Sequence, residues 1–248
     1  MKQKKITAAV IIVLIAALVA ESAYLLVFSG EGQSGRYLPS LTIDGDVGCA
    51  AKLSSSDGKY ILTCNGEETD LSAEVFEFEG AEYTGVLLSD IIAETELETE
   101  KTHIYYVGWD GMMSSVDAAG LEKNYIVFGE HGWEAMNEGY PASSNVKEMK
   151  SITAVADNPS DVPASVTVKD DSGYDRTVSP GTLLLLMDRV SSPRYHGQSE
   201  KAGKEVVVMT TDTYVQIGES RLTVQDNEIK DLSENEKIQE NDNSLNAG

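Results

Sequence analysis

The two cysteines, Cys49 and Cys64, are the residues of this 248-residue chain best suited to chemistry. In an oxidising compartment such a pair forms a disulfide, here closing a loop of roughly 15 residues and contributing about 3 kcal/mol to stability. A thiolate is also a soft ligand for a transition metal. Two free thiols are the third alternative. Because a disulfide-bonded sulfur cannot serve as a ligand, the first two roles exclude each other.

Histidines, acidic turns and aromatic residues offer weaker candidates. None of the three histidines has the spacing of a zinc motif. His131, between Gly-Glu and Gly-Trp, lies in a loop that can line a cleft or simply be exposed, whereas His103 in an apolar strand is expected to be structural. Asp110-Gly111 and the 170–175 segment can offer carboxylates to Ca²⁺, although turn chemistry also explains them. Four aromatic residues can form a ligand cleft or belong to the core: Tyr105, Tyr106, Trp109 and Trp133.

Charge and missing motifs exclude several function classes. The formal net charge is −22, which repels phosphate backbones, so no nucleic-acid partner is expected. The chain has no Gly-x-Ser-x-Gly elbow and no phosphate-binding glycine loop, so hydrolase and nucleotide-enzyme functions have no support. A cell-surface protein or a small molecule remains as partner.

The first 28 residues predict export. Lys2, Lys4 and Lys5 precede an apolar segment, 6–28, that is interrupted mainly by Glu21. About 20 apolar residues span a bilayer, and the basic flank stays cytoplasmic. The segment is either an uncleaved anchor, which we favour, or a signal peptide cut near 20–22. We therefore expect an extracytoplasmic protein, membrane-anchored or secreted.

The body of the chain alternates short strands with few helices. Hydrophobic periodicity and turn residues predict a helix at 87–93 and another starting at Ser179-Pro180-Gly181. A hairpin is expected around 170–173, between 164–169 and 174–179. The remaining predicted strands are 41–47, 59–64, 75–78, 103–107, 124–128, 149–155, 205–210, 213–217 and 221–224.

The order of segments in the first half resembles the molybdopterin-binding domain of the sulfite oxidase family. The segments that carry the resemblance are LTIDGDV (41–47), the strand ending at Cys64-Asn65-Gly66, YTGVLLSDII (83–92), YYVGWDGMMSSVD (105–117), NYIVFGEHGWEAM (124–136) and VKEMKSITAV (146–155). The resemblance covers about residues 37–157. It implies an α+β fold with a mixed sheet, sulfite or sulfur-oxide redox chemistry, and molybdenum ligation by a cysteine after a strand, which is Cys64 here.

The same region departs from the family at the positions that would hold the cofactor. Members of the family hold the cofactor phosphate with basic side chains, yet residues 37–157 contain no arginine. Six lysines stand against 23 acidic residues, a formal charge of −17. Burying an anionic cofactor without guanidinium groups costs several kcal/mol per ion. The family's Val-Pro-Leu turn is Val86-Leu87-Leu88 here.

These observations lead to one expected architecture and three candidate functions. We expect an anchor or signal peptide (1–28), a linker (29–36), a sulfite-oxidase-like α+β domain (37–157), a β-rich part (158–227) and a disordered acidic tail (228–248). The favoured function is a non-catalytic binding or scaffold module without a cofactor. The alternatives are a molybdopterin oxidoreductase, for which Arg176, Arg189 or Arg194 would have to reach the cofactor, and a calcium- or sugar-binding surface module.

Overall fold

The computed structural model describes residues 40–97, 101–117, 120–169, 175–188, 194–201 and 204–233. The predicted anchor or signal peptide, the linker and the end of the acidic tail lie outside these ranges. Within them, no helix has both the length and the apolar character needed to cross a bilayer.

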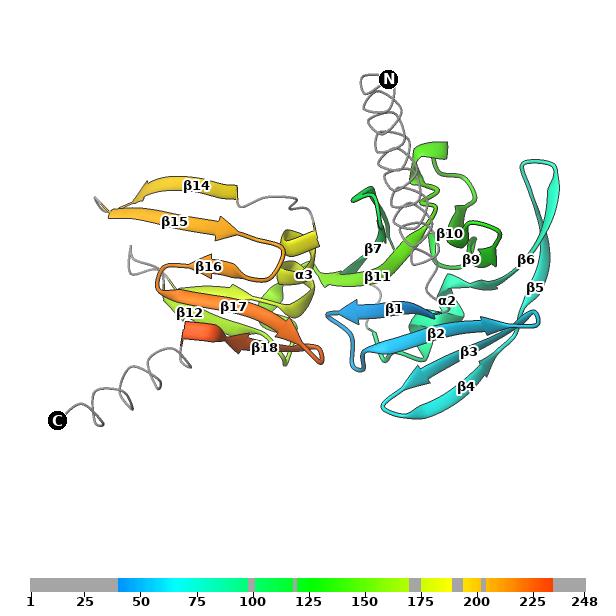
Figure 1. Ribbon diagram of the computed structural model, residues 1–248, viewed down its shortest axis with the longest axis horizontal. Helices are drawn as coiled ribbons and strands as arrows, with labels where there is room; N and C mark the ends of the chain where they lie inside the picture. Colours follow the sequence, from blue (N-terminus) through cyan, green and yellow to red (C-terminus); the bar gives the residue numbers. More distant parts are fainter. Residues whose placement is uncertain are drawn as a thin grey trace, which may run out of the picture. The chain divides into compact units, whose positions relative to one another are not determined.

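The first half of the chain is built on a seven-stranded mixed sheet (Figure 1). Its strand order is β4-β3-β2-β1-β11-β7-β8, and β1 pairs in parallel with β11 while the other neighbours are antiparallel. The strands are β1 Ser40–Gly45, β2 Ala51–Ser56, β3 Lys59–Cys64, β4 Glu67–Leu71, β7 Thr102–Gly108, β8 Met113–Val116 and β11 Met149–Ala156. Because β1 and β11 run in parallel, both end at the same edge of the sheet.

A second, four-stranded antiparallel sheet has the order β10-β9-β6-β5. Its strands are β5 Glu74–Phe78, β6 Ala81–Leu87, β9 Asn124–Gly129 and β10 Gly132–Asn137. The helix α2 Leu88–Ala93 follows β6 directly, and the short 3₁₀ helix η3 Ala142–Ser144 precedes β11. The predicted helix at 87–93 is thereby confirmed.

Two-residue turns set the register of the hairpins in this half. Asp57-Gly58, Asn65-Gly66 and Glu79-Gly80 each have positive φ at both residues, the geometry of the type I′ turns that suit a twisted hairpin. The first two turns fix β3 between β2 and β4, and the register places Cys64 opposite Ala51. The end of β3 therefore lies beside the loop that carries Cys49.

The buried core of the first half collects side chains from both sheets and α2. Trp133 and Tyr106 are its largest fully buried members, so these two aromatic residues belong to the core. Burial raises the pKa of the Tyr106 hydroxyl far above its usual range, and the group stays protonated. Trp109, by contrast, is 42% exposed.

The second half contains a hairpin, a helix and a five-stranded antiparallel sheet with a separate core. The 3₁₀ helix η4 Pro159–Asp161 leads into the hairpin of β12 Val166–Lys169 and β13 Asp175–Val178, followed by α3 Pro180–Asp188. The sheet consists of β14 Arg194–Lys201, β15 Lys204–Thr210, β16 Val215–Ile217, β17 Ser220–Gln225 and β18 Glu228–Asp231. The predicted hairpin, helix start and β meander are confirmed.

The predicted disorder from residue 228 is wrong for the first residues of the tail. Glu228–Asp231 forms β18, paired with β17 across the two-residue turn Asp226-Asn227, both with positive φ. The half-buried Ile229 packs on the core of the second half. A tight turn and one apolar anchor are enough to order this acidic strand.

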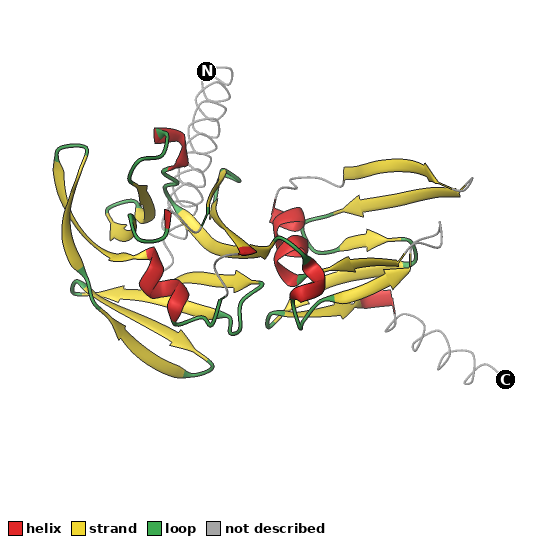
Figure 2. Ribbon diagram, turned by 180° about the vertical axis from the view of Figure 1, so that it is seen from behind, coloured by secondary structure: helices red, strands yellow, loops and turns green. Residues whose placement is uncertain are grey.

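Strands dominate the described chain, as Figure 2 shows, and helices are few and short. A β-rich α+β protein with a mixed sheet is therefore confirmed at the level of class. The described residues from 40 onward belong to one compact unit. The helix α3 contacts β1 and β11 of the first half as well as β16 and β17 of the second.

Candidate ligand-binding cavity beside the disulfide

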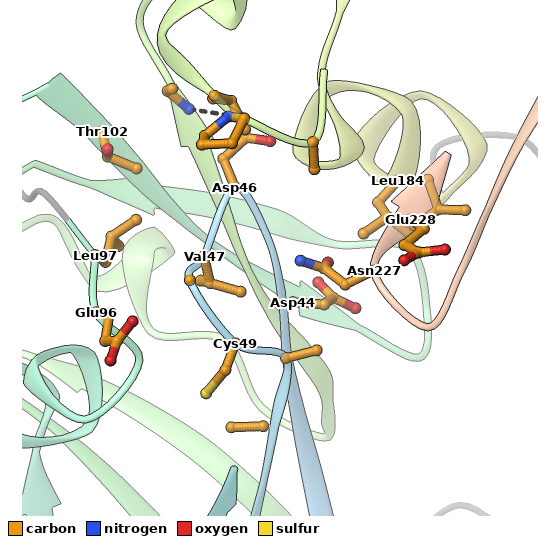
Figure 3. A pocket seen from close by; sticks show the side chains of 18 of the residues that line it. Asp44, Asp46, Val47, Cys49, Glu96, Leu97, Thr102, Leu184, Asn227 and Glu228 are labelled. Carbon is orange, nitrogen blue, oxygen red and sulfur yellow. Dashed lines mark hydrogen bonds between the residues drawn. The ribbon is translucent and has the colours of Figure 1, made fainter. Parts of the chain in front are cut away.

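A cavity of about 900 Å³ opens where β1 and β11 end (Figure 3). Its walls come from the end of β1, the 46–50 loop, the segment after α2, η4, α3 and the β17–β18 turn. Among its lining residues are six carboxylates, two lysines and an apolar wall: Asp44, Asp46, Glu96, Asp161, Asp226, Glu228; Lys52, Lys101; Val47, Leu97, Val162, Pro163, Leu184, Val224. A volume of this size suits a small organic ligand.

Asp46 fixes the chain where it leaves β1. Its Oδ1 accepts a hydrogen bond from the backbone N–H of Gly181 at 2.9 Å, and its Oδ2 accepts one from the N–H of Ala156 at 2.9 Å. Its own N–H donates to the Ala154 carbonyl at 2.9 Å. One buried carboxylate thus joins the end of β1 to the end of β11 and the start of α3.

Two glycines allow this close junction. A Cβ on Gly45 would lie 2.3 Å from the Ala154 carbonyl oxygen, and a Cβ on Gly181 would lie 2.1 Å from the same atom. Gly45 also has φ +95°, which side-chain-bearing residues rarely adopt. β1 and α3 therefore approach the same carbonyl of β11 without a side chain between them.

The β17–β18 turn closes another side of the cavity. Gly45 donates its N–H to Oδ1 of Asn227 at 3.0 Å, across 182 residues of sequence. The turn that orders β18 therefore also holds the rim of the cavity. Figure 3 shows Asn227 and Glu228 near Asp44, with Glu96 and Leu97 on the opposite side.

The disulfide holds the 46–50 loop. Cys49 and Cys64 are bonded, with their Cα atoms 6.0 Å apart. The N–H groups of Gly48 and Cys49 both donate to the carbonyl of Thr95 after α2. The disulfide alternative is the one this structure adopts, and in it the sulfur of Cys64 has no thiolate to offer a metal.

Asp44 is the most perturbed carboxyl group on the cavity wall. Burial raises its pKa to about 6, because desolvation penalises the ionised form. The hydroxyl of Thr153 opposes this shift by donating to Oδ1 at 2.7 Å. The nearby ion pair of Lys150 and Asp188 acts in both directions, since Asp188 raises the pKa of Asp44 and Lys150 lowers it.

The cavity lining does not suit a pterin cofactor. Six carboxylates against two lysines leave the lining with a formal charge of −4, and no arginine is among the described residues that line it. The phosphate and the anionic metal-dithiolene group of such a cofactor would meet repulsion there. The sulfur that the resemblance assigns to molybdenum is bonded to Cys49.

A compact metal site is also absent from the part of the chain that the structure describes. No three His, Cys, Asp or Glu side chains there converge as ion ligands. Asp110 accepts a hydrogen bond from the N–H of Met112 at 2.8 Å, which is ordinary turn chemistry. The other candidate, the 170–175 segment, lies outside the described residues except for Asp175.

The histidines and the proposed arginines lie elsewhere. His131 is exposed in the two-residue turn between β9 and β10 and does not line the cavity. His103 lies at the surface, with its Nε2 3.2 Å from Oδ1 of Asp157. Arg176, on β13, is not part of the lining, and Arg189 and the side chain of Arg194 are outside the described set.

Sequence reasoning found one part of this site and missed the rest. The cysteine pair was visible from its type and spacing. Asp44 and Asp46 flank Gly45, a pattern typical of a turn, and Asn227 lies where the chain becomes polar and acidic. The one local signal was the Asp-Asn pair at 226–227, which suits a type I′ hairpin.

Comparison of the chain with models of known families, with curated proteins and with solved structures finds no match.

Proposed function

We propose that this protein is a non-catalytic ligand-binding or scaffold module displayed outside the membrane, with a fold related to the sulfite-oxidase-type molybdopterin domain. The observation that carries the proposal is the cavity beside the Cys49–Cys64 disulfide. The lining of this cavity is acidic, and the Cys64 sulfur is bonded to Cys49.

The order of segments supports the relation to the molybdopterin domain. The segments behind the resemblance correspond to β1, β3, β6 with α2, the β7–β8 hairpin, the β9–β10 hairpin and β11. Most of them meet in one mixed sheet around the parallel pair β1–β11. A retained scaffold with a changed site is a common route to new function, because function depends on the site rather than on the fold.

Molybdenum redox chemistry of this type needs two features, and the lack of both in this cavity supports a loss of catalysis. In that family a cysteine thiolate ligates the molybdenum, and here the Cys64 sulfur is bonded to Cys49. The cofactor also needs cationic partners for its phosphate, and the cavity presents a carboxylate excess instead. The oxidoreductase alternative therefore requires both a reduced Cys64 and basic groups from elsewhere.

Extracytoplasmic display is supported by the sequence and by the disulfide together. The basic residues before the apolar segment 6–28 orient the body outward. Structural disulfides persist in oxidising compartments and are rare in the cytosol. A covalently closed 49–64 loop therefore suits the exported location that the N-terminal segment predicts.

Metal and pterin analysis tests the absence of the cofactor. The full chain is produced in a host that synthesises molybdopterin, and molybdenum and pterin are measured per mole of protein. We expect neither at stoichiometric level. A Cys49→Ser variant, which leaves Cys64 as a free thiol, is the matched control. Molybdenum in the wild type would refute the proposal, and molybdenum only in Cys49→Ser would make the disulfide, rather than the charge, the barrier.

A further inference from the structure

The cavity beside the disulfide combines separated negative charges with an apolar wall. Glu96 lies on one side of the cavity, and Asp44 and Glu228 lie on the other (Figure 3). Val47 lies between the two sides, Leu97 lies beside Glu96, and Leu184 lies beside Glu228. The site therefore offers several anionic contacts at a distance from one another, and apolar surface near them.

This arrangement does not match a single metal ion. Calcium needs six to eight oxygen ligands that converge on one point, and within the described ranges no three acidic, histidine or cysteine side chains converge in this way. A ligand that uses these carboxylates must be long enough to reach groups on different walls.

Asp44 is a deeply embedded carboxylate on the cavity wall. Its Oδ1 accepts a hydrogen bond from the Thr153 hydroxyl at 2.7 Å. A cationic group in the cavity would stabilise the ionised form of this carboxyl group, which burial disfavours.

We infer that the cavity binds a linear polyamine, a flexible ligand whose ammonium groups are separated by short methylene chains. The ammonium groups reach the separated carboxylates, and the methylene chains cover Val47, Leu97 and Leu184. The formal charge of −4 on the lining favours a ligand of several positive charges. This inference rests on the proposed binding function and names its ligand class.

Two neutralising substitutions on opposite walls test the assignment. Glu96→Gln and Asp226→Asn each remove one lining charge while keeping side-chain size. Asp226 has positive φ, and asparagine tolerates that conformation. The matched controls are Glu122→Gln and Asp70→Asn, two exposed acidic residues outside the lining.

Calorimetric titration of the disulfide-bonded protein with spermidine gives the readout. We expect saturable one-to-one binding that weakens about 5- to 10-fold in each lining variant and less than 2-fold in each control, as for a charge contact in a partly desolvated site. Binding should also weaken as salt is raised, because salt screens these contacts. Mg²⁺ at the same charge concentration should compete poorly.

Three results would overturn the inference. One is no saturable binding of spermidine. Another is equal weakening in the lining variants and the controls, which means general attraction by an acidic protein. The third is a tri-lysine peptide that binds more than 10-fold tighter than spermidine, which would make the occupant a basic peptide. Each leaves the cofactor-free module standing, because that proposal fails only by the molybdenum measurement.

Discussion

Removal of the Asp46 carboxylate should reveal how strongly one side chain joins the two halves of this protein. In the Asp46→Ala variant, the N–H groups of Gly181 and Ala156 lose their acceptor. Asp46 is 7% exposed, and the bond to Gly181 is buried. Water therefore cannot easily replace the lost contacts.

The size of the effect follows from two charge-assisted hydrogen bonds. Such bonds contribute about 1.5–3 kcal/mol each, and a buried donor left without a partner is destabilising by a similar amount. We expect a loss of about 3–5 kcal/mol in the free energy of unfolding, a large part of the 5–15 kcal/mol that is typical of native proteins. For a folded unit of this size, the melting temperature should fall by roughly 10 °C.

Urea unfolding followed by the fluorescence of the buried Trp133 measures this loss. Hydrogen exchange adds a local readout, because the Gly181 and Ala156 amides should lose protection beyond the global change. Asp70→Ala, at an exposed position on the edge strand β4, is the control and should change stability by less than about 0.5 kcal/mol. A loss below about 1 kcal/mol in Asp46→Ala, with unchanged protection of both amides, would refute the reasoning.

Three further substitutions test the same region. Because burial raises the pKa of Asp44 to about 6, ionisation of this group destabilises the fold, and the free energy of unfolding should fall as pH rises from about 4 to 6. The Asp44→Asn variant should flatten this pH dependence and add about 2–3 kcal/mol of stability at pH 7.5. An unchanged pH profile in the variant would contradict this prediction. Gly181→Ala should cost about 2–4 kcal/mol because its Cβ meets a β11 carbonyl, whereas Gly129→Ala, with its nearest neighbour at 3.9 Å, should be tolerated in thermal melts. Replacing Cys49 and Cys64 together by Ser should lower the free energy of unfolding by about 2–4 kcal/mol. Dithiothreitol should bring the stability of the wild type to the same value. Equal stability of the oxidised wild type and the double variant would argue against the disulfide.

Local sequence patterns predicted the elements well where the physical signal was local. Lys59–Cys64 alternates between the core and the outside and is followed by Asn-Gly, so both the strand and its turn were visible. The start of α3 at Pro180 follows from the preference of proline for the first turn of a helix. The acidic β18 was missed because its order depends on one apolar residue, Ile229, and on a partner strand.

The cavity was not predictable in the same way. Asp46 bonds to Gly181 across 135 residues, and Gly45 bonds to Asn227 across 182. Nothing in the composition around any of these residues specifies the partner. His131, by contrast, had a suggestive loop sequence, yet its hairpin turn is exposed and outside the cavity lining.

Local residue patterns are sufficient to specify the β-rich elements, the tight turns between them, the acidic character of the body and the availability of a cysteine pair. Each of these depends on residue type and on neighbours a few positions away. The bond between Cys64 and Cys49, and the meeting of Asp44, Asp46 and Asn227 at one sheet edge, depend on long-range packing. The parallel pairing of β1 with β11 and the packing of α3 against both bring these distant residues together.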